Sequence, residues 1–388
     1  MNRKRIAIVI NSLKLGGGAE KVATTLGSEL NERGYGVVFL VFQKAEVEYK
    51  FKGDYLNIGK DIKIKNSFGA FWAIFRRAKK IQIYCRNNDI STLISFMEEA
   101  NFASIVSKIF FKNKAKVLVS VREDPRFKKK IAKILMKILH PGADKVVANS
   151  QKAEKVLQEN FGIKKTVNIY NPLDFDKILK LKTEAISPEE EVVFSSGFIF
   201  VNIGRLTRQK GQLFLLDSFK EVCQTNPRAK LVIIGEGELK KILEARIEEL
   251  SLRDKVFLLE GKDNVYKYLA RSDCFVSSSI WEGLPNTLIE ALAVGLPLIS
   301  TDCLTGPREI IAPDIELDKQ IGYPYQGKFG YLVKTKENYL SQGQEKEILS
   351  QAMKSMIKEK DKFIFSRKDL AKFELDSVVK KWEDLIIN

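Results

Sequence analysis

Short apolar runs alternate with amphipathic stretches along most of this chain, and a polar or glycine-rich loop follows many of the runs. The clearest runs are Ile6–Ile10, Val37–Phe42, Lys116–Val121, Phe198–Gly204, Lys230–Ile234 and Val256–Leu259. Such a run is typical of a buried parallel strand, and the helix after it returns the chain to the start of the next strand. We therefore predict an α/β protein with two Rossmann-like, doubly wound domains that face each other across a cleft.

The domain limits follow from where this alternation pauses. At 388 residues the chain is long enough for two cores. We expect a first domain over residues 1–174 and a second over 194–366. Between them, residues 175–193 are rich in Lys and then Glu, which favours a linker. Residues 367–388 are predicted to form one final helix.

The charge of the chain is uneven. Residues 1–175 carry 33 Lys and Arg against 16 Asp and Glu, whereas the whole chain has a net charge of +16. The excess of positive charge therefore lies in the first domain, and either an anionic partner or a merely solvated basic surface would account for it.

The four cysteines are scattered, which favours a reducing compartment and argues against a disulfide framework or a structural zinc site. No uncharged apolar run is long enough to cross a bilayer, and the apolar segment after Arg5 is too short for a secretory signal. We expect a cytoplasmic protein.

The segment Trp281–Glu290 carries the most specific chemistry. It follows an apolar strand over Asp273–Ser279 and opens a helix that ends at Gly295. A helix start at the carboxyl end of a strand binds anions, but Glu282 and Glu290 on either side would repel a phosphate alone. They fit better as acceptors for hydroxyl groups on a ligand that also carries phosphate. A sugar nucleotide has both.

Several motifs together resemble a known family. Glu282 and Glu290, eight apart with Gly283 and Pro285 between them, resemble the Glu-x7-Glu signature of the retaining GT-B glycosyltransferases of family 4. Further matches are the Gly-Gly-Ala-Glu loop at residues 17–20, Gly-Arg-Leu…Lys-Gly at 204–211 and Gly-Pro-Arg-Glu at 306–309. The Gly16–Gly18 loop fits neither the dinucleotide fingerprint nor a Walker A loop.

The resemblance implies roles for individual residues. Glu282 would hold hydroxyls of the donor sugar and Glu290 those of the ribose, while Arg205 and Lys210 stabilise the departing diphosphate. The remaining residues assigned to the donor are Gly17, Gly18, Gly261, Asn264, Val265, Gly283, Leu284, Pro285, Asn286 and Thr287. It also implies retention without a protein nucleophile, no obligatory metal or other cofactor, and a final helix that crosses back to the first domain.

The acceptor side is less well marked. Many members of the family carry a histidine in the loop that corresponds to residues 122–126, where this chain has Arg122 and Glu123. The single histidine of the chain is His140, which we expect to be a loop residue without a chemical role. Arg122 or Glu123 would then take the place of the family histidine.

Two segments of the first domain combine apolar and basic residues. In the helix predicted over 127–140, Lys130, Lys133 and Lys137 share one face, and Ile131, Ile134, Leu135 and Ile138 share another. This pattern fits a helix in a membrane interface and equally a helix packed on the sheet with a wet basic side. For the aromatics Phe68, Phe71, Trp72 and Phe75, helical spacing favours core packing.

We therefore expect a retaining transferase that moves a hexose or N-acetylhexosamine from a nucleotide-diphosphate sugar, UDP-linked in our expectation, to a lipid-linked or glycan acceptor at an anionic membrane surface. A GT-B-fold sugar-nucleotide epimerase is the alternative, and it would turn over donor without acceptor. A nucleic-acid-binding protein is suggested by charge alone, without a known module, so we expect no nucleic-acid partner.

Overall fold

The computed structural model describes residues 4–46, 48–60, 62, 67–335 and 344–388, although the side chains of Ser67, Phe68, Ala70 and Gln344 lie outside this description. Within these residues no helix combines the length and apolarity that crossing a bilayer requires. The chain divides into two compact units. The first comprises Met1–Pro172 with Leu375–Asn388, and the second comprises Leu173–Glu374.

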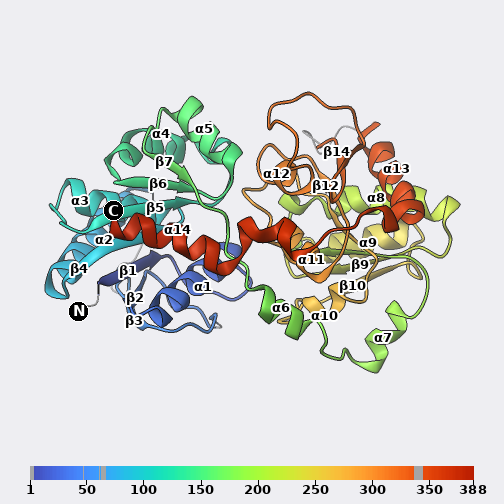
Figure 1. Ribbon diagram of the computed structural model, residues 1–388, viewed down its shortest axis with the longest axis horizontal. Helices are drawn as coiled ribbons and strands as arrows, with labels where there is room; N and C mark the ends of the chain where they lie inside the picture. The colour runs from blue at the N-terminus through green and yellow to red at the C-terminus, as the bar shows by residue number, and fades with distance from the viewer. Residues whose placement is uncertain (1–3, 47, 61, 63–66, 336–343) are drawn as a thin grey trace. The chain divides into compact units, whose positions relative to one another are not determined.

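The first unit is built on a seven-stranded sheet in the order β3-β2-β1-β4-β5-β6-β7 (Figure 1), and every pairing is parallel. The strands are β1 (Arg5–Ile10), β2 (Gly36–Val41), β3 (Asp54–Asn57), β4 (Ile90–Phe96), β5 (Lys116–Val121), β6 (Lys145–Ala148) and β7 (Thr166–Asn168). The order reverses between β1 and β4. This reversal creates a switch point, where loops at the strand carboxyl ends diverge and ligands bind in open α/β sheets.

Helices cover both faces of this sheet because its strands are apolar on both sides. Ala7 and Val9 pack toward α2 (Ser67–Asn87), α3 (Glu98–Ile109), α4 (Lys130–Leu139) and α5 (Gln151–Phe161). Ile6, Ile8 and Ile10 pack toward α1 (Gly18–Glu32) and α14 (Leu375–Ile387). Figure 1 shows α14, in red, against this unit, and its Trp382 is fully buried with its ring centroid 6.2 Å from that of Phe96.

One prediction about this unit was wrong. Phe71 and Trp72, expected in the core, are exposed, and the side chain of Phe68 lies outside the described residues. His140, expected to be a loop residue without a chemical role, lies in the 3₁₀ turn His140–Gly142 between α4 and β6. Its side chain is fully buried, and its ring centroid lies 5.8 Å from that of Phe102 in a T-shaped arrangement. Burial lowers the pKa of its imidazole to about 4.

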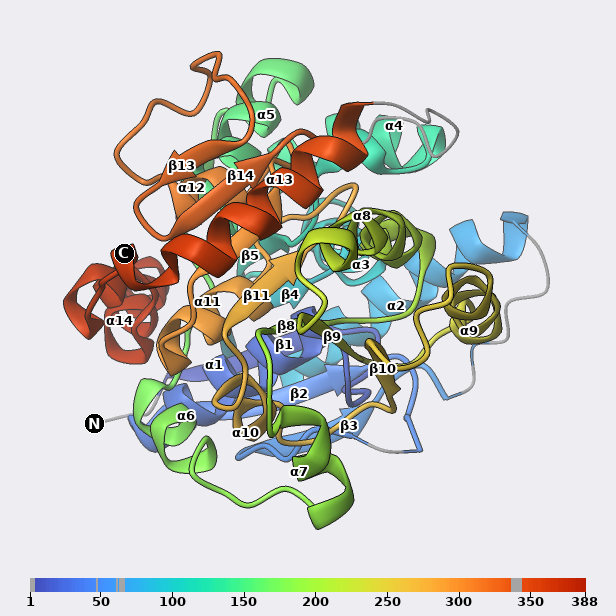
Figure 2. The ribbon, with the colours of Figure 1, turned by 90° about the vertical axis from the view of Figure 1, so that its right-hand side faces the viewer.

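The second unit also contains a seven-stranded sheet, in the order β10-β9-β8-β11-β12-β14-β13. Its strands are β8 (Ile199–Ile203), β9 (Lys230–Ile234), β10 (Val256–Leu259), β11 (Cys274–Ser277), β12 (Leu298–Thr301), β13 (Tyr325–Gly327) and β14 (Gly330–Val333). Only the β13–β14 pair among the pairings of these named strands is antiparallel. Figure 2 shows β11, β8, β9 and β10 following one another across this sheet, with the switch point between β8 and β11.

One face of the second sheet is covered by α8 (Gln212–Thr225), α9 (Lys240–Glu249) and α13 (Gln344–Glu359), and α8 and α13 pack side by side (Figure 2). The remaining helices include α10 (Tyr266–Leu269), α11 (Asn286–Val294) and α12 (Pro307–Ile311). α11 contacts α6 (Phe175–Leu181), α10, α12 and the strands β11 and β12. The segment that carries the two glutamates therefore packs directly on the central strands.

Two segments differ from expectation. Residues 175–193, predicted as a linker, contain α6 (Phe175–Leu181) and most of α7 (Pro188–Phe194), because Asp174 and Ser187 each cap a helix start with their side chains. Residues 367–388, predicted as one helix, form a 3₁₀ helix over Arg367–Phe373 and then α14, with extended backbone at Glu374. The α/β fold with two doubly wound sheets is confirmed.

Candidate active site

Two loops of the second unit meet at its switch point. The loop after β8 includes the 3₁₀ turn Arg208–Lys210, and the loop after β11 includes Ser278–Glu282. The Ile280 amide donates to the Gln209 carbonyl at 2.8 Å, and Gln209 Nε2 donates to the Trp281 carbonyl at 2.9 Å. These bonds hold both loops in one fixed arrangement at the edge where a ligand of this sheet would bind.

Lys210 and Glu282 form an ion pair between these two loops. Lys210 Nζ lies 2.6 Å from Glu282 Oε1, and the two side chains are 18% and 9% exposed. The backbone of Lys210 is held in place because Ser278 Oγ donates to its carbonyl at 2.8 Å. Gly211, the next residue, has φ +64°, and a Cβ there would lie 2.2 Å from the Ser278 carbonyl oxygen. Only glycine fits this close approach without strain.

An ammonium has three hydrogen-bond donors and Glu282 uses one, so Lys210 can orient the carboxylate and also bind an anionic group. Glu282 in turn keeps acceptor capacity on its second oxygen. The pair therefore combines a positive group for phosphate and a negative group for hydroxyls within one hydrogen-bond length. The roles predicted for the two residues, Lys210 for the diphosphate and Glu282 for sugar hydroxyls, stay predictions.

Glu290 lies on α11, which begins directly after the Gly283–Pro285 turn. The N-cap residue, Pro285, gives the helix start no side-chain hydrogen bond. Glu290 is buried one helical turn further along, and the hydroxyl of the buried Tyr266 lies 3.5 Å from its Oε1. The helix N-terminus suits an anion, whereas the buried carboxylate suits hydroxyl donors.

A third loop, after β12, closes on the glutamate segment. Thr305 Oγ1 donates to the Glu282 carbonyl. Gly306 has φ +93°, and a Cβ on it would lie 2.7 Å from the Gly283 carbonyl oxygen. Arg308 pairs with the buried Asp302 and also donates to the carbonyls of Leu317 and Lys319. Sequence reasoning missed Thr305 and Gln209, because their contribution depends on loops that are distant in sequence.

The other residues predicted for the donor differ in their surroundings. Arg205 is exposed, with Nη2 3.4 Å from Gln209 Oε1. Gly261 is exposed and Val265 is half-buried, whereas the side chain of Asn264 forms hydrogen bonds within the protein. Asn264 Nδ2 donates to the Leu181 carbonyl and to Glu184, and its Oδ1 accepts from the Tyr266 amide. Asn264 therefore anchors α6 against α10.

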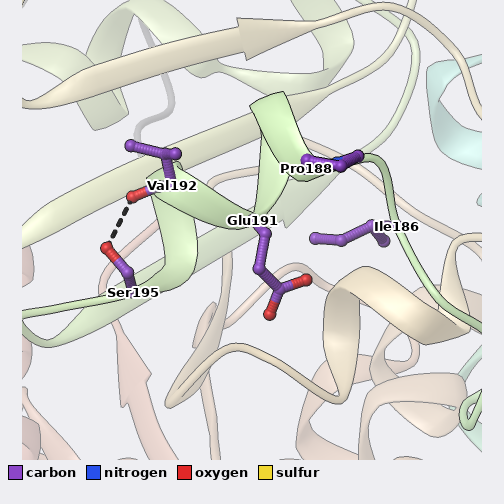
Figure 3. A pocket seen from close by; sticks show the side chains of 5 residues that line it. All are labelled: Ile186, Pro188, Glu191, Val192 and Ser195. Atoms are coloured by element: carbon purple, nitrogen blue, oxygen red, sulfur yellow. Dashed lines mark hydrogen bonds between the residues drawn. The ribbon is translucent and has the colours of Figure 1, made fainter.

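A pocket on the second unit is lined by Ile186, Pro188, Glu191, Val192 and Ser195 (Figure 3). These residues lie in α7 or within two residues of its ends, and Ser195 Oγ donates to the Val192 carbonyl at 2.9 Å. None of its lining residues is one of those predicted for the donor or the acceptor.

The predicted residues of the first unit lie at the carboxyl ends of its own strands. Gly17 is the N-cap of α1 after β1, and Gly18 is the first residue of that helix. A Cβ on Gly17 would lie 2.0 Å from Glu20 Oε2, so the Glu20 carboxylate lies against this helix start. The glycines permit this close approach.

Arg122 and Glu123, directly after β5, are in different electrostatic states. Glu123 is paired with Lys128, which also lies 2.8 Å from Glu98. Burial alone would lower the pKa of Lys128, but these two carboxylates outweigh it and raise that pKa. Arg122 donates instead to uncharged groups of Ser120 and Asn171, with its guanidinium 5.6 Å from the Phe96 ring centroid. Burial lowers its pKa to about 9, which leaves it charged at neutral pH.

The sequence contains an Asp-x-Asp triplet, Asp174-Phe175-Asp176, of a spacing that can hold a divalent ion. Here Asp174 caps α6 by accepting from the Lys177 amide at 2.9 Å, and Asp176 pairs with Arg367 at 2.6 Å. Among the residues described, no group of three or more His, Cys, Asp or Glu side chains is arranged to hold a metal.

Comparison with known proteins gives a consistent picture. Residues 16–177 match the family model described as Glycosyltransferase Family 4, and residues 183–361 match Glycosyl transferases group 1. An uncharacterized glycosyltransferase of Methanocaldococcus jannaschii is 38% identical over 84% of this chain and 86% of its own length.

A second relative is N-acetylgalactosamine-N,N'-diacetylbacillosaminyl-diphospho-undecaprenol 4-alpha-N-acetylgalactosaminyltransferase of Campylobacter jejuni. It is 30% identical over 82% of this chain and 87% of its own length. Among solved structures, HepE of Anabaena in complex with UDP superposes with a TM-score of 0.74 at 16% identity, covering 98% of this chain and 99% of HepE. The lipopolysaccharide outer core galactosyltransferase WaaB superposes with a TM-score of 0.67 at 18% identity and covers 99% of both chains.

Proposed function

The chain belongs to glycosyltransferase family 4 and has the GT-B fold, and from this premise we propose that it is a retaining transferase of lipid-linked glycan assembly. It moves a hexose or N-acetylhexosamine from a nucleotide-diphosphate sugar to a sugar acceptor carried on a lipid diphosphate. The observation that carries the proposal is the Lys210–Glu282 pair beside the start of α11. It combines a positive group for the diphosphate with a negative group for the hydroxyls of the transferred sugar.

In the proposed donor complex, Glu282 accepts hydrogen bonds from hydroxyls of the transferred sugar, and Glu290 accepts them from the ribose. Lys210, Arg205 and the amide groups of Asn286 and Thr287 bind the diphosphate. Negative charge grows on the diphosphate as its bond to the anomeric carbon breaks. Preorganised donors at this position stabilise the transition state, and each is worth about 3 kcal/mol.

Retention follows if the acceptor attacks from the face that the diphosphate leaves. The bond between the anomeric carbon and the phosphate oxygen breaks with its electron pair, and the acceptor oxygen forms the new bond on the same face. The acceptor proton passes to the departing phosphate. No nucleophile from the protein and no obligatory metal enters this sequence of steps.

The donor nucleotide is proposed to be uridine diphosphate, because the structural neighbour HepE is described in complexes with UDP and UDP-glucose. The acceptor is proposed to be an undecaprenol-type lipid diphosphate, because the Campylobacter jejuni relative carries such an acceptor in its name. On the acceptor side, the pairing of Glu123 with Lys128 leaves Arg122 as the better candidate for the anionic part of that substrate.

A lipid-linked acceptor requires the enzyme to work at a bilayer, which we place at the cytoplasmic face of the cell membrane. Lys130, Lys133 and Lys137 of α4 are proposed to contact anionic lipid, where each is worth about 1 kcal/mol. Residues 1–175 hold the excess of positive charge. All four cysteines are free thiols, as in proteins of reducing compartments.

The test is a screen of UDP-, GDP- and ADP-sugars with lipid-diphosphate acceptors, read by released nucleotide and by transferred sugar. On the active donor, Glu282→Gln keeps the side-chain shape and is expected to lower transfer by about 10² to 10³. Glu260→Gln, at an exposed position of the same unit, is the matched control and should leave transfer unchanged. Near-normal transfer by Glu282→Gln would refute the assignment, and conversion of the donor to an epimeric nucleotide sugar without acceptor would indicate an epimerase.

A further inference from the structure

Large apolar side chains of the first unit gather at an exposed site that the transfer reaction does not use. Phe71 and Trp72 of α2 are 46% and 53% exposed, and Ile109 and Phe110 at the end of α3 are 47% and 58% exposed. Phe75 joins them, with its ring centroid 5.2 Å from Phe71, 6.0 Å from Trp72 and 5.4 Å from Phe110. We call these five residues the aromatic patch. A contiguous exposed apolar surface marks an interaction site.

Basic side chains flank the aromatic patch. Arg76 and Lys79 are exposed on α2, next to Phe75, and Lys112 and Lys114 are exposed just after Phe110. Arg77 points elsewhere, since it is buried and paired with Glu99 at 2.7 Å. Aromatic rings surrounded by Lys and Arg are typical of the interface between lipid headgroups and acyl chains.

The aromatic patch lies beside the turn that follows α4. Ile109 Cδ1 lies 2.5 Å from the position of a Cβ on Gly142, so the end of α3 packs against the turn that follows α4. α4 buries Met136 but exposes Ile131, Ile134 and Ile138, and Ile131 is 72% exposed. These three isoleucines therefore lie outside the core that Met136 joins. Both surfaces belong to helices that cover the same face of the first sheet.

We propose that the aromatic patch is a membrane-inserting surface, which enters an anionic bilayer together with the exposed isoleucines of α4. The proposal rests on the proposed function, since a lipid-linked acceptor brings the enzyme to lipid. It extends that function by assigning the anchoring to apolar insertion at two helix surfaces in addition to the contact of three lysines with headgroups. Positive charge in residues 1–175 matches an anionic lipid surface rather than a basic or neutral protein partner.

Trp72 gives a direct measurement of insertion. Vesicles of phosphatidylcholine and phosphatidylglycerol are prepared with and without brominated acyl chains, which quench tryptophan only at contact distance. The full chain should lose emission on the brominated vesicles. Trp72→Phe should lose this quenching while still binding, because Trp382 is fully buried and Trp281 is half-buried. Equal emission on both vesicle types, at full binding of the natural chain, would overturn the proposal.

A second variant measures how much the aromatic patch contributes. Phe71→Ser with Phe110→Ser should lower the partition coefficient on these vesicles by roughly 30-fold, from the apolar area removed. The matched control replaces Ile242 and Ile364, which are exposed on the second unit, by Ser. This control should bind as the natural chain does. Equal binding by the two double variants would overturn the proposal. It would also be overturned if Phe71→Ser with Phe110→Ser changed a dimer to a monomer and left vesicle binding unchanged, because the aromatic patch would then be a contact between two copies of the chain.

The outcome is separable from that of the proposed function. Donor hydrolysis and transfer to a water-soluble acceptor, both without vesicles, should be unchanged in Phe71→Ser with Phe110→Ser, since neither residue is assigned to donor or acceptor. Quenching at Trp72 with no transferase activity on any donor would refute the proposed function and leave the membrane surface standing. Transfer activity without quenching at Trp72 would refute the membrane surface and leave the proposed function standing.

Discussion

Lys210→Met is expected to destabilise the second unit by about 2 kcal/mol. An exposed ion pair is worth about 0–1 kcal/mol, whereas removing one partner of a buried pair costs about 3–5 kcal/mol. Lys210 and Glu282 lie between these cases, with side chains 18% and 9% exposed and a 2.6 Å separation. Most of the cost arises because the Glu282 carboxylate stays buried after its positive partner is gone.

A double-mutant cycle isolates the interaction free energy of Lys210 and Glu282. Glu282→Gln alone should cost about 1 kcal/mol, because the flexible Lys210 ammonium can turn toward water. The double variant should cost about the same 1 kcal/mol, which gives a coupling of about 2 kcal/mol. The exposed Lys240–Glu260 pair of the same unit is the control, with a separation of 3.1 Å. Its coupling should stay below about 0.5 kcal/mol.

The assay is urea unfolding followed by circular dichroism, combined with transfer kinetics on the same four proteins. Stability should return when both charges are removed, but activity should not. Lys210→Met is expected to lower kcat/KM by about 10² to 10³, since a donor to the departing diphosphate is lost. The reasoning would be refuted by additive stability effects, or by recovery of transfer in the double variant.

Three further predictions concern backbone strain and burial. Met97 has φ +72° and ψ 159°, a backbone region that is essentially restricted to glycine. Met97→Gly should therefore be more stable than Met97→Ala by about 1 kcal/mol or more. A glycine variant that is less stable than the alanine variant in urea unfolding would contradict this strain. Gly211→Ala should lower both stability and transfer because its Cβ would meet the Ser278 carbonyl. Gly162, with φ +70° and open space around it, is the control, and Gly162→Ala should lower the free energy of unfolding by only about 1 kcal/mol. Equal losses of stability in the two variants in a thermal melt would argue against the close approach. Burial lowers the pKa of His140 from 6.5 in the unfolded chain to about 4 in the folded one, so the unfolded chain binds more protons between these values. The contribution of His140 to stability is therefore present above pH 6.5, and about 3 kcal/mol of it is lost as the pH falls to 4. His140→Leu should lack this loss in urea unfolding across that pH range, and identical pH profiles of the two proteins would contradict it.

Much of the fold could be predicted because the strands are buried on both faces. Runs such as Ile6–Ile10 and Val256–Leu259 are apolar and bounded by loops, and the structure has strands at both. The strand Asp54–Asn57 lacks this signal, since it lies at the sheet edge and is partly exposed. Edge strands need only one partner and carry no strong apolar pattern. The helices of residues 175–193 depend on capping by Asp174 and Ser187, a local signal that composition obscured.

The elements that carry the candidate residues could be predicted, but the contacts of these residues could not. The positions of Glu282 and Glu290 on a loop and the following helix follow from strand and helix patterns, and the structure has them there. That Lys210 pairs with Glu282 depends on two loops, 72 residues apart, meeting at the switch point. Likewise, no local pattern shows that Thr305 supports Glu282 or that Trp72 is exposed. Helical spacing identifies one face of α2, but not whether another element covers it.

The most direct measurement of the central claim is a structure with a bound nucleotide sugar that the transfer screen has identified as active. The account predicts the diphosphate at Lys210 and the start of α11, hydroxyls of the transferred sugar at Glu282, and the ribose at Glu290. A nucleotide bound away from the Trp281–Glu290 segment would contradict it.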